Sequence, residues 1–266
     1  MDSISLWKER VENRLRELLK GAGPELLREA MSYYPLQEGK RIRPLFTVAV
    51  AHALGGDEED AITVGCAIEM VHNYSLIHDD LPAMDDDELR RGLPACHVKY
   101  GEAIAVLAGD ALLTYAFEVL SNESLYRSLK GSRLLKILNT VARKSGVEGM
   151  VGGQALDITS AGNPHEISLK KTAALFQACF MCGGILSDRE DLLPILEKIG
   201  EFVGLLFQIT DDILDRDGYW EVFGAEVSMR KVKELHAQVT RLLPSAFGKP
   251  PPELIYLIEK IRDRIT

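Results

Sequence analysis

Three aspartates at the end of an apolar stretch are the residues of this chain best suited to binding a metal ion. Asp211, Asp212 and Asp215 lie within and directly after the apolar run 202–214. On a helix these positions fall within about 100° of one another, so we expect the three carboxylates to point the same way. Like charges at close range resist ionising together, and a hard divalent cation with oxygen ligands relieves that repulsion. The pattern indicates a magnesium-binding face, the alternative being a solvated acidic face.

A second acidic cluster, residues 79–88, also follows an apolar run. Asp79 and Asp85 are six positions apart, which on an unbroken helix would leave their side chains about 120° apart. Pro82 lies between them and kinks or ends a helix, so a break there would let both carboxylates reach the same ions. Two acidic clusters that face each other would form a box for several magnesium ions, which suits a diphosphate ligand.

Clustered cations supply a complementary signal. Lys40, Arg41 and Arg43 lie at the start of a predicted helix, 43–54, where the helix dipole prefers negative charge. The arrangement is favourable if an anion docks there, because free backbone N–H groups then assist the side chains; the alternative is an exposed basic turn. Arg90 and Arg91 follow the first acidic cluster and offer planar guanidinium groups suited to phosphate oxygens.

The spacing of His72 from Asp79 suggests that this histidine lies near the acidic and basic residues described above. The predicted helix 61–78 is apolar around most of its circumference, so we expect it to be buried in a bundle. His72 precedes Asp79 by seven residues, about two turns, so both side chains can face one cavity. A satisfied core histidine is the alternative. Cys179 and Cys182 have CxxC spacing without a second pair or a preceding strand, so we interpret them as core residues.

Composition limits the remaining possibilities. The chain has 266 residues, 46% of them hydrophobic, and a formal net charge of −9, which argues against general nucleic-acid binding. Four cysteines in apolar contexts suggest a reducing compartment. The charged segment 1–20 resembles neither a signal nor a transit peptide, and the longest apolar stretch, 103–117, is interrupted by Asp110. We therefore expect a soluble, cytoplasmic protein without a membrane span.

The elements that position these residues are predicted to be helices throughout, because no stretch shows convincing strand alternation. We expect residues 1–266 to form one all-α domain, a bundle of about ten helices around a central cavity. The predicted helices are 6–19, 25–33, 43–54, 61–78, 100–120, 132–145, 146–160, 168–186, 194–215, 226–243 and 254–265.

Five motifs, in this order along the chain, resemble the motif set of the trans-prenyltransferases, the polyprenyl synthases that include farnesyl and geranylgeranyl diphosphate synthases. They are 39–44 (GKRIRP), 79–85 (DDLPAMD) with 90–92 (RRG), 153–157 (GQALD), 171–172 (KT) and 207–215 (FQITDDILD). The resemblance covers about residues 25–217 and is strongest to bacterial farnesyl diphosphate synthases. It implies the all-α isoprenoid synthase fold, usually a homodimer, and magnesium-dependent condensation of an allylic diphosphate with isopentenyl diphosphate.

The same resemblance implies roles for individual residues. Asp79, Asp80 and Asp85 would bind magnesium from one wall of the cavity, and Asp211, Asp212 and Asp215 from the other. Isopentenyl diphosphate would contact Lys40, Arg43, His72 and Arg91. The allylic diphosphate would contact Arg90, Lys171, Thr172 and Gln208. The residues closest to the chemistry would be Asp79, Asp85, Asp211 and Lys171, and no protein nucleophile is required.

Product length in this family is a steric matter. Tyr74 lies five positions before Asp79, and Ser75 follows it. Together with the insertion at Pro82-Ala83, an aromatic residue at this position resembles the arrangement that stops growth at C15. We therefore expect farnesyl diphosphate made from dimethylallyl or geranyl diphosphate, with geranylgeranyl diphosphate synthesis as the alternative.

The chain departs from the family pattern after Asp215. The family continues with a Gly-Lys loop and a Lys-x-Thr segment that closes over the allylic diphosphate, and neither is found here. Residues 217–220 read as a turn, and Arg230, Lys231 and Lys233 are the candidate substitutes. Smaller departures are Glu38, in place of a glycine, and Ala95. The loss of a closing segment leaves a non-catalytic regulatory subunit as a further alternative.

Overall fold

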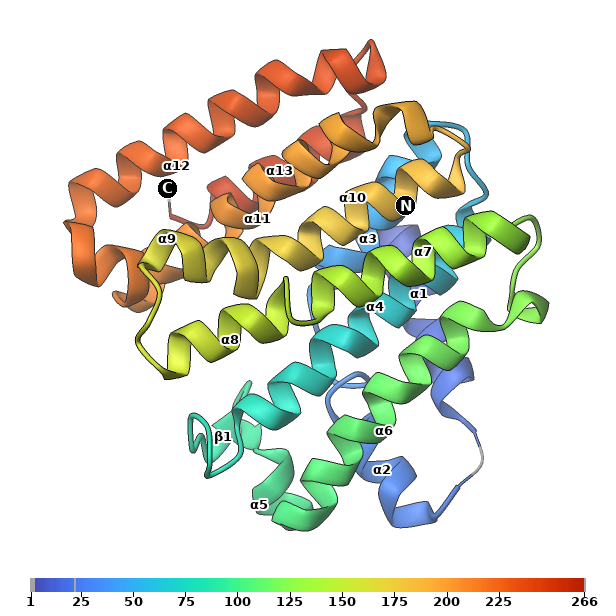
Figure 1. Ribbon diagram of the computed structural model, residues 1–266, viewed down its shortest axis with the longest axis vertical. Helices are drawn as coiled ribbons and strands as arrows, with labels where there is room; N and C mark the ends of the chain where they lie inside the picture. Colours follow the sequence, from blue (N-terminus) through green and yellow to red (C-terminus); the bar gives the residue numbers. More distant parts are fainter. Residues whose placement is uncertain (1–2, 22, 266) are drawn as a thin grey trace.

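The computed structural model describes residues 3–21 and 23–265, and helices dominate that part of the chain (Figure 1). The predicted all-α bundle is confirmed. The α-helices are α1 Ser3–Leu19, α2 Glu25–Tyr33, α3 Ile42–Ala53, α4 Glu58–Asp79, α5 Cys96–Tyr100, α6 Glu102–Ser121, α7 Gly131–Ser145, α8 Met150–Ile158, α9 Pro164–Ile167, α10 Ala174–Leu186, α11 Leu193–Asp215, α12 Gly218–Phe247 and α13 Pro252–Arg262. Shorter elements are the 3-10 helices η1 Glu123–Leu125 and η3 Glu190–Leu192, the π-helix η2 Ser168–Ala173, and the strands β1 Leu89–Arg90 and β2 Leu93–Pro94.

Helix α4 lies buried within the bundle, as its largely apolar circumference predicted. Asp57 caps its N-terminus by accepting hydrogen bonds from the backbone N–H groups of Glu59 and Asp60. Along one side it meets α3 so closely that a Cβ at Gly65 would lie 2.9 Å from the Cα of Pro44. This glycine contact places the basic start of α3 directly against α4.

A second close approach sets the position of η2. A Cβ on Gly204 of α11 would lie 2.4 Å from the Cα of Ala173, and one on Gly200 would lie 2.7 Å from the Cα of Gln177. Any side chain at these two positions would push α11 away from η2 and α10. The glycines therefore bring Lys171 and Thr172, in η2, within reach of α11.

The structure differs from the sequence predictions at residues 89–94 and at residues 168–173. The short hairpin β1–β2 was not predicted, because each strand has only two residues. Its turn uses Arg91 and Gly92, both with positive φ (54° and 76°). The predicted helix 168–186 is interrupted, since residues 168–173 form a π-helix before α10 begins. Single π-turns of this kind are frequent at functional sites.

The junction after α11 also differs from the prediction. Residues 217–220 were expected to form a turn before a helix at 226, but α12 begins at Gly218 and only breaks at Gly224, whose φ is 79°. Two residues, Arg216 and Asp217, connect α11 to α12. The absence of a longer segment at this point agrees with the missing family motif.

Helix α6 lies along α4 near the edge of the bundle (Figure 1). Within the described residues it is the one helix long and apolar enough to match a membrane span by length and composition. Those two criteria are also met by core helices, and Ala108, Leu112 and Ala116 of α6 are fully buried in the protein. Its outer side leaves Val106 and Leu107 exposed.

Candidate active site

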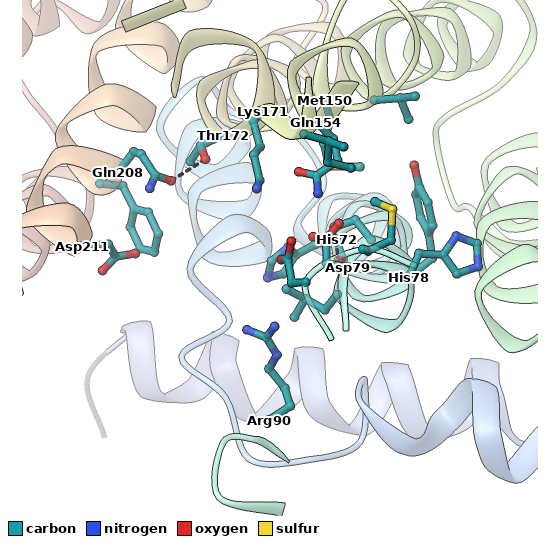
Figure 2. Close-up of a pocket in the computed structure, with 18 of the residues that line it drawn as sticks. His72, His78, Asp79, Arg90, Met150, Gln154, Lys171, Thr172, Gln208 and Asp211 are labelled. Carbon is teal, nitrogen blue, oxygen red and sulfur yellow. Dashed lines mark hydrogen bonds between the residues drawn. The ribbon is translucent and has the colours of Figure 1, made fainter. Parts of the chain in front are cut away.

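A cavity of about 720 Å³ lies among α3, α4, α8, η2 and α11. Figure 2 shows Lys171 and Arg90 extending toward it from opposite sides, with Asp79 and Asp211 apart from each other. The cavity brings together thirteen of the residues predicted for the site: Arg43, His72, Tyr74, Ser75, Asp79, Asp85, Arg90, Arg91, Lys171, Thr172, Gln208, Asp211 and Asp215. Lys40, Asp80 and Asp212 do not line it.

The first acidic cluster has the broken-helix geometry that Pro82 predicted. Helix α4 ends at Asp79, and the following turn returns so that the backbone N–H of Asp85 donates to the carbonyl of Asp79 at 2.8 Å. Both residues line the cavity. Burial raises the pKa of Asp79 to about 6, although Lys171 opposes that shift, and burial raises the pKa of Asp85 as well. These carboxylates therefore carry charge in a poorly solvated place.

Asp80, unlike Asp79, does not line the cavity. Its side chain is 0% exposed and accepts hydrogen bonds from Arg90 Nε, at 2.9 Å, and from the hydroxyl of Tyr34. That hydroxyl in turn accepts from the backbone N–H of Cys96 at 3.0 Å. Both oxygens of Asp80 hold Arg90 and Tyr34 in this structure, and its role as a metal ligand stays a prediction.

In the second acidic cluster, too, some carboxylates line the cavity and one is buried away from it. Asp211 and Asp215 line the cavity, whereas Asp212 is 4% exposed and turned into the α11–α12 junction. Asp212 accepts from Gln208 Nε2 at 2.7 Å and from the backbone N–H of Tyr219 at 2.9 Å. It thus satisfies one of the free N–H groups at the start of α12. Asp212 therefore does not share the cavity with Asp211 and Asp215 in this structure, and its role as a metal ligand stays a prediction.

An arginine from the C-terminal part of the chain reaches Asp211. Arg264 forms an ion pair with the Asp211 carboxylate and lies 5.5 Å from the centre of the Phe207 ring. Burial raises the pKa of Asp211, and Arg264 opposes that shift. The sequence gave no local signal for this contact, because Arg264 lies outside every motif and more than fifty residues from Asp211.

The π-helix η2 presents two polar groups to the cavity. Lys171 Nζ lies 2.6 Å from Asp157 Oδ2 of α8, and Thr172 Oγ1 donates to Gln208 Oε1 at 2.5 Å. The backbone at Lys171 is so close to α8 that a Cβ on Gly153 would lie 2.2 Å from its nitrogen. The motif 153–157 therefore supplies the close contact and the carboxylate that hold Lys171 in place.

A cationic group occupies the side of the cavity formed by α3, α4 and the β-hairpin. The guanidinium of Arg43 is buried 4.9 Å from the centre of the Phe176 ring. His72 is neutral, since burial, and then the nearby charges of Arg43 and Arg91, hold its pKa well below the ordinary value. Lys40 is exposed beside this group rather than in the lining. A site with this much positive charge and little solvent suits a polyanion.

Gln154, from the motif 153–157, also lines the cavity. Both amide atoms of Gln154 are buried without a hydrogen-bond partner. An unpaired buried amide carries a desolvation cost, so a ligand that enters the cavity gains a partner there. Arg230, Lys231 and Lys233, by contrast, are not among the lining residues.

The carboxylates of the site are not gathered at one point. Among the residues that the structure describes, no three His, Cys, Asp or Glu side chains form a preformed metal cluster. The free carboxylates are instead divided between the end of α4 and the end of α11. Hard oxygen donors divided in this way fit Mg²⁺, which keeps several non-protein oxygens and is commonly shared with substrate phosphates.

Comparisons with known proteins agree with this geometry. The sequence model of the polyprenyl synthetase family matches residues 24–229. A farnesyl diphosphate synthase of Bacillus subtilis is 42% identical over 228 residues, which are 83% of this chain and 77% of that protein. A heterodimeric geranylgeranyl pyrophosphate synthase large subunit of Arabidopsis thaliana is 44% identical over 76% of this chain and 55% of its own length.

A solved structure of a synthase has a similar fold. The apo structure of a farnesyl/geranylfarnesyl diphosphate (FPP/GFPP) synthase from Zymomonas mobilis superposes with a TM-score of 0.88 at 35% identity, covering 97% of this chain and 98% of that one. The motifs, the cavity that unites them and these similarities lead to one conclusion: the chain belongs to the polyprenyl synthetase family.

Proposed function

We propose that this protein is a short-chain trans-prenyl diphosphate synthase that condenses isopentenyl diphosphate with an allylic diphosphate. The observation that carries the proposal is the lining of one cavity by carboxylates from two helices, by a separate cationic group, and by apolar residues. The carboxylates suit a metal-bound diphosphate and the cations a second one. A terpene cyclase on a related scaffold would not need the second anion site.

Each part of the cavity has a task in this reaction. Lys171, Thr172 and Gln208 orient the allylic diphosphate, and their cationic and amide groups stabilise the charge that builds on it as its C–O bond ionises. Arg43, His72 and Arg91 hold the second diphosphate so that its double bond faces the allylic carbon. The buried walls exclude water, which would otherwise quench the carbocation. The proton lost in the last step passes to the departing diphosphate in the family's usual mechanism.

Magnesium is the proposed cofactor. Asp79 and Asp85 at one wall, with Asp211 and Asp215 at the other, are the side chains that would hold it. When bound, Mg²⁺ neutralises negative charge on the leaving diphosphate. Asp211 is ion-paired with Arg264 in this structure, so that arginine and the metal compete for the same carboxylate.

The apolar end of the cavity supports a C15 product. Tyr74 of α4 is buried, lines the cavity and contacts the His78 ring at a centroid distance of 5.8 Å. Burial, and then Asp79, raise its pKa to about 12, so it stays neutral. Five residues of helix place it about 7 Å below Asp79, where a growing hydrocarbon chain would meet it. Geranylgeranyl diphosphate, the C20 product, is the second candidate because related synthases of that name are equally similar in sequence.

The outer face of α6 supports a homodimer. Val106 and Leu107 are exposed there, 41% and 52% respectively. Beside them lies a hollow of about 780 Å³ between α6 and the α1–α2 region, whose apolar lining residues include Leu18, Leu19, Leu27, Met31, Leu107 and Ala111 and whose charged ones are Arg28, Asp110 and Glu118. An exposed apolar patch of this kind marks a contact surface, and we propose that a second copy of the chain covers it.

The proposed activity is tested by product analysis. Purified protein is incubated with Mg²⁺, labelled isopentenyl diphosphate and either dimethylallyl or geranyl diphosphate, and the dephosphorylated products are sized. We expect a C15 alcohol, and no product when EDTA is present. A C20 alcohol would replace the farnesyl assignment with the geranylgeranyl one, whereas no product with either primer would favour a regulatory subunit.

Replacing a proposed metal ligand should stabilise the metal-free protein. Asp79 has a pKa raised from 3.8 to about 6, so its ionisation costs folding stability as the pH rises through that window. The penalty is complete at pH 7.5 and is at most about 3 kcal/mol. We expect Asp79→Asn to unfold at a higher temperature than wild type at pH 7.5 in EDTA, and at the same temperature at pH 4.

The same variant should lose activity. Removal of one charge from the magnesium site is expected to lower kcat by on the order of 10²–10³-fold. Glu9→Gln, at an exposed position of α1, is the matched control and should change neither quantity. An Asp79→Asn protein that is less stable than wild type at pH 7.5 would contradict the electrostatic cost assigned to this carboxylate.

Truncating Tyr74, the residue proposed to limit product length, should lengthen the product. Tyr74→Ala removes the phenol ring that a C15 chain would meet, so we expect products of C20 or longer in the same assay. Tyr256→Ala, on the exposed side of α13, controls for loss of a tyrosine elsewhere. If Tyr74→Ala still stops at C15, Tyr74 is not the residue that limits length.

The dimer is tested by sedimentation. The wild-type protein should sediment with twice the chain mass at micromolar concentration, and Leu107→Glu should yield monomers because a charge would be buried at the contact. Leu135→Glu introduces the same charge on the exposed face of α7 and should leave the dimer intact. A monomeric wild-type protein would refute the assignment of α6 as the contact.

A further inference from the structure

The cationic side of the cavity is built around one buried carboxylate. Glu69 lies on α4 one turn before His72 and is 4% exposed. Its Oε1 atom is 3.2 Å from Nη1 of Arg41. Its charge also favours the protonated forms of Arg43 and Arg91, whose pKa values burial lowers. Glu69 therefore offsets part of the repulsion among all three arginines.

Arg41 has an unusual backbone conformation. It is the residue before α3, with φ 52° and ψ 34° in the left-handed region that non-glycine residues rarely occupy. Such a conformation persists only where surrounding contacts determine it. Here the guanidinium donates to the carbonyl of Gln37 and to Glu69, and its Nε lies 3.9 Å from Oε1 of Glu12 on α1.

The loop before Arg41 rests on this side chain. A Cβ on Gly39 would lie 3.0 Å from Nη1 of Arg41 and 3.5 Å from Nη1 of Arg91. A side chain at this position would press against the guanidinium of Arg41, so the glycine lets the loop backbone lie directly on that group. Lys40 and Arg43 flank Arg41 in the chain, so the direction in which each side chain leaves the backbone depends on the turn at Arg41.

Neither Arg41 nor Glu69 lines the cavity. We propose that the buried Glu69–Arg41 ion pair is the positioning element of the second anion site, fixing the turn that sets Arg43 in the cavity lining, with Lys40 beside it, to receive the diphosphate of the homoallylic substrate. This inference rests on the proposed function for the identity of that substrate. It adds two positioning residues that make no contact with the substrate and act through the cations they hold.

A purely structural ion pair would behave differently from a positioning one. Breaking any buried pair leaves an uncompensated charge and destabilises the fold, so loss of stability alone does not distinguish the two. A positioning role acts on one substrate only. The distinguishing quantity is therefore the KM for isopentenyl diphosphate, compared with the KM for the allylic diphosphate and with kcat.

The first experiment uses Glu69→Gln, which keeps the side-chain size and removes the charge. We expect the KM for isopentenyl diphosphate to rise about 10- to 100-fold, in keeping with small displacements of binding groups. The KM for geranyl diphosphate, and kcat at saturation, should stay within about threefold of wild type. Equal rises in both KM values, or no rise in either, would overturn the proposal.

A second pair of variants separates the backbone from the side chain. Arg41→Gly adopts a positive φ without strain but lacks the guanidinium, so we expect it to raise the KM for isopentenyl diphosphate as Glu69→Gln does. A wild-type KM in Arg41→Gly would overturn the proposal. The matched control is Glu59→Gln, which breaks another arginine–glutamate pair on α4, with Arg10 at 2.6 Å, and should leave both KM values unchanged.

Calorimetry makes the outcome independent of turnover. Isopentenyl diphosphate is titrated alone into wild-type protein and into Glu69→Gln, or into Glu69→Asp if the first variant does not fold. Weaker binding by the variant supports the positioning role even if the wild type forms no product, in which case only the proposed reaction fails. Equal binding by both proteins overturns the positioning role and leaves the proposed reaction intact.

Discussion

The crowding of carboxylates in a partly buried space is the constraint on which this site depends. Adjacent aspartates occur at the end of α4 and near the end of α11, and in both pairs the second one is buried and fully hydrogen-bonded. The first of each pair, Asp79 or Asp211, faces the cavity. Because neighbouring helical residues point about 100° apart, one aspartate can face the ligand while the next ties down the segment that follows.

This division links the acidic motifs to the rest of the fold. Asp80 holds Arg90 and, through Tyr34, the start of α5. Asp212 holds Gln208 and the start of α12. Burial raises the pKa values of Asp79 and Asp211, and this shift is the electrostatic cost of placing these two carboxylates in the cavity. Sites that bind charged ligands commonly carry such a cost in the ligand-free protein.

Much of this organisation follows from local sequence. The apolar circumference of α4 predicted its burial, and Pro82 predicted the break that joins Asp85 to Asp79. Spacing along the same helix predicted that His72 and Asp79 share a cavity. These predictions succeed because helical periodicity and the missing N–H of proline act over a few residues, without information from distant parts of the chain.

The remaining features depend on contacts that spacing does not encode. A helical projection could not show which aspartate of each pair is buried and hydrogen-bonded, because Arg90 and the N–H of Tyr219 approach from other elements. Likewise Arg264 reaches Asp211 only after α13 has folded back. The π-helix at Lys171 depends on its tight fit to Gly153, and the early start of α12 depends on the cap that Asp212 supplies.

The two-residue joint between α11 and α12 has a mechanical consequence. Two extended residues span only about 7 Å, and the Asp212 carboxylate is bonded to the first turn of α12. The first segment of α12, before the break at Gly224, therefore cannot swing outward without unwinding the helical turns that carry Asp211 and Asp215. This rim of the cavity is therefore fixed in place, so the exclusion of water from the reacting carbon falls to the buried walls and not to a movement of this junction.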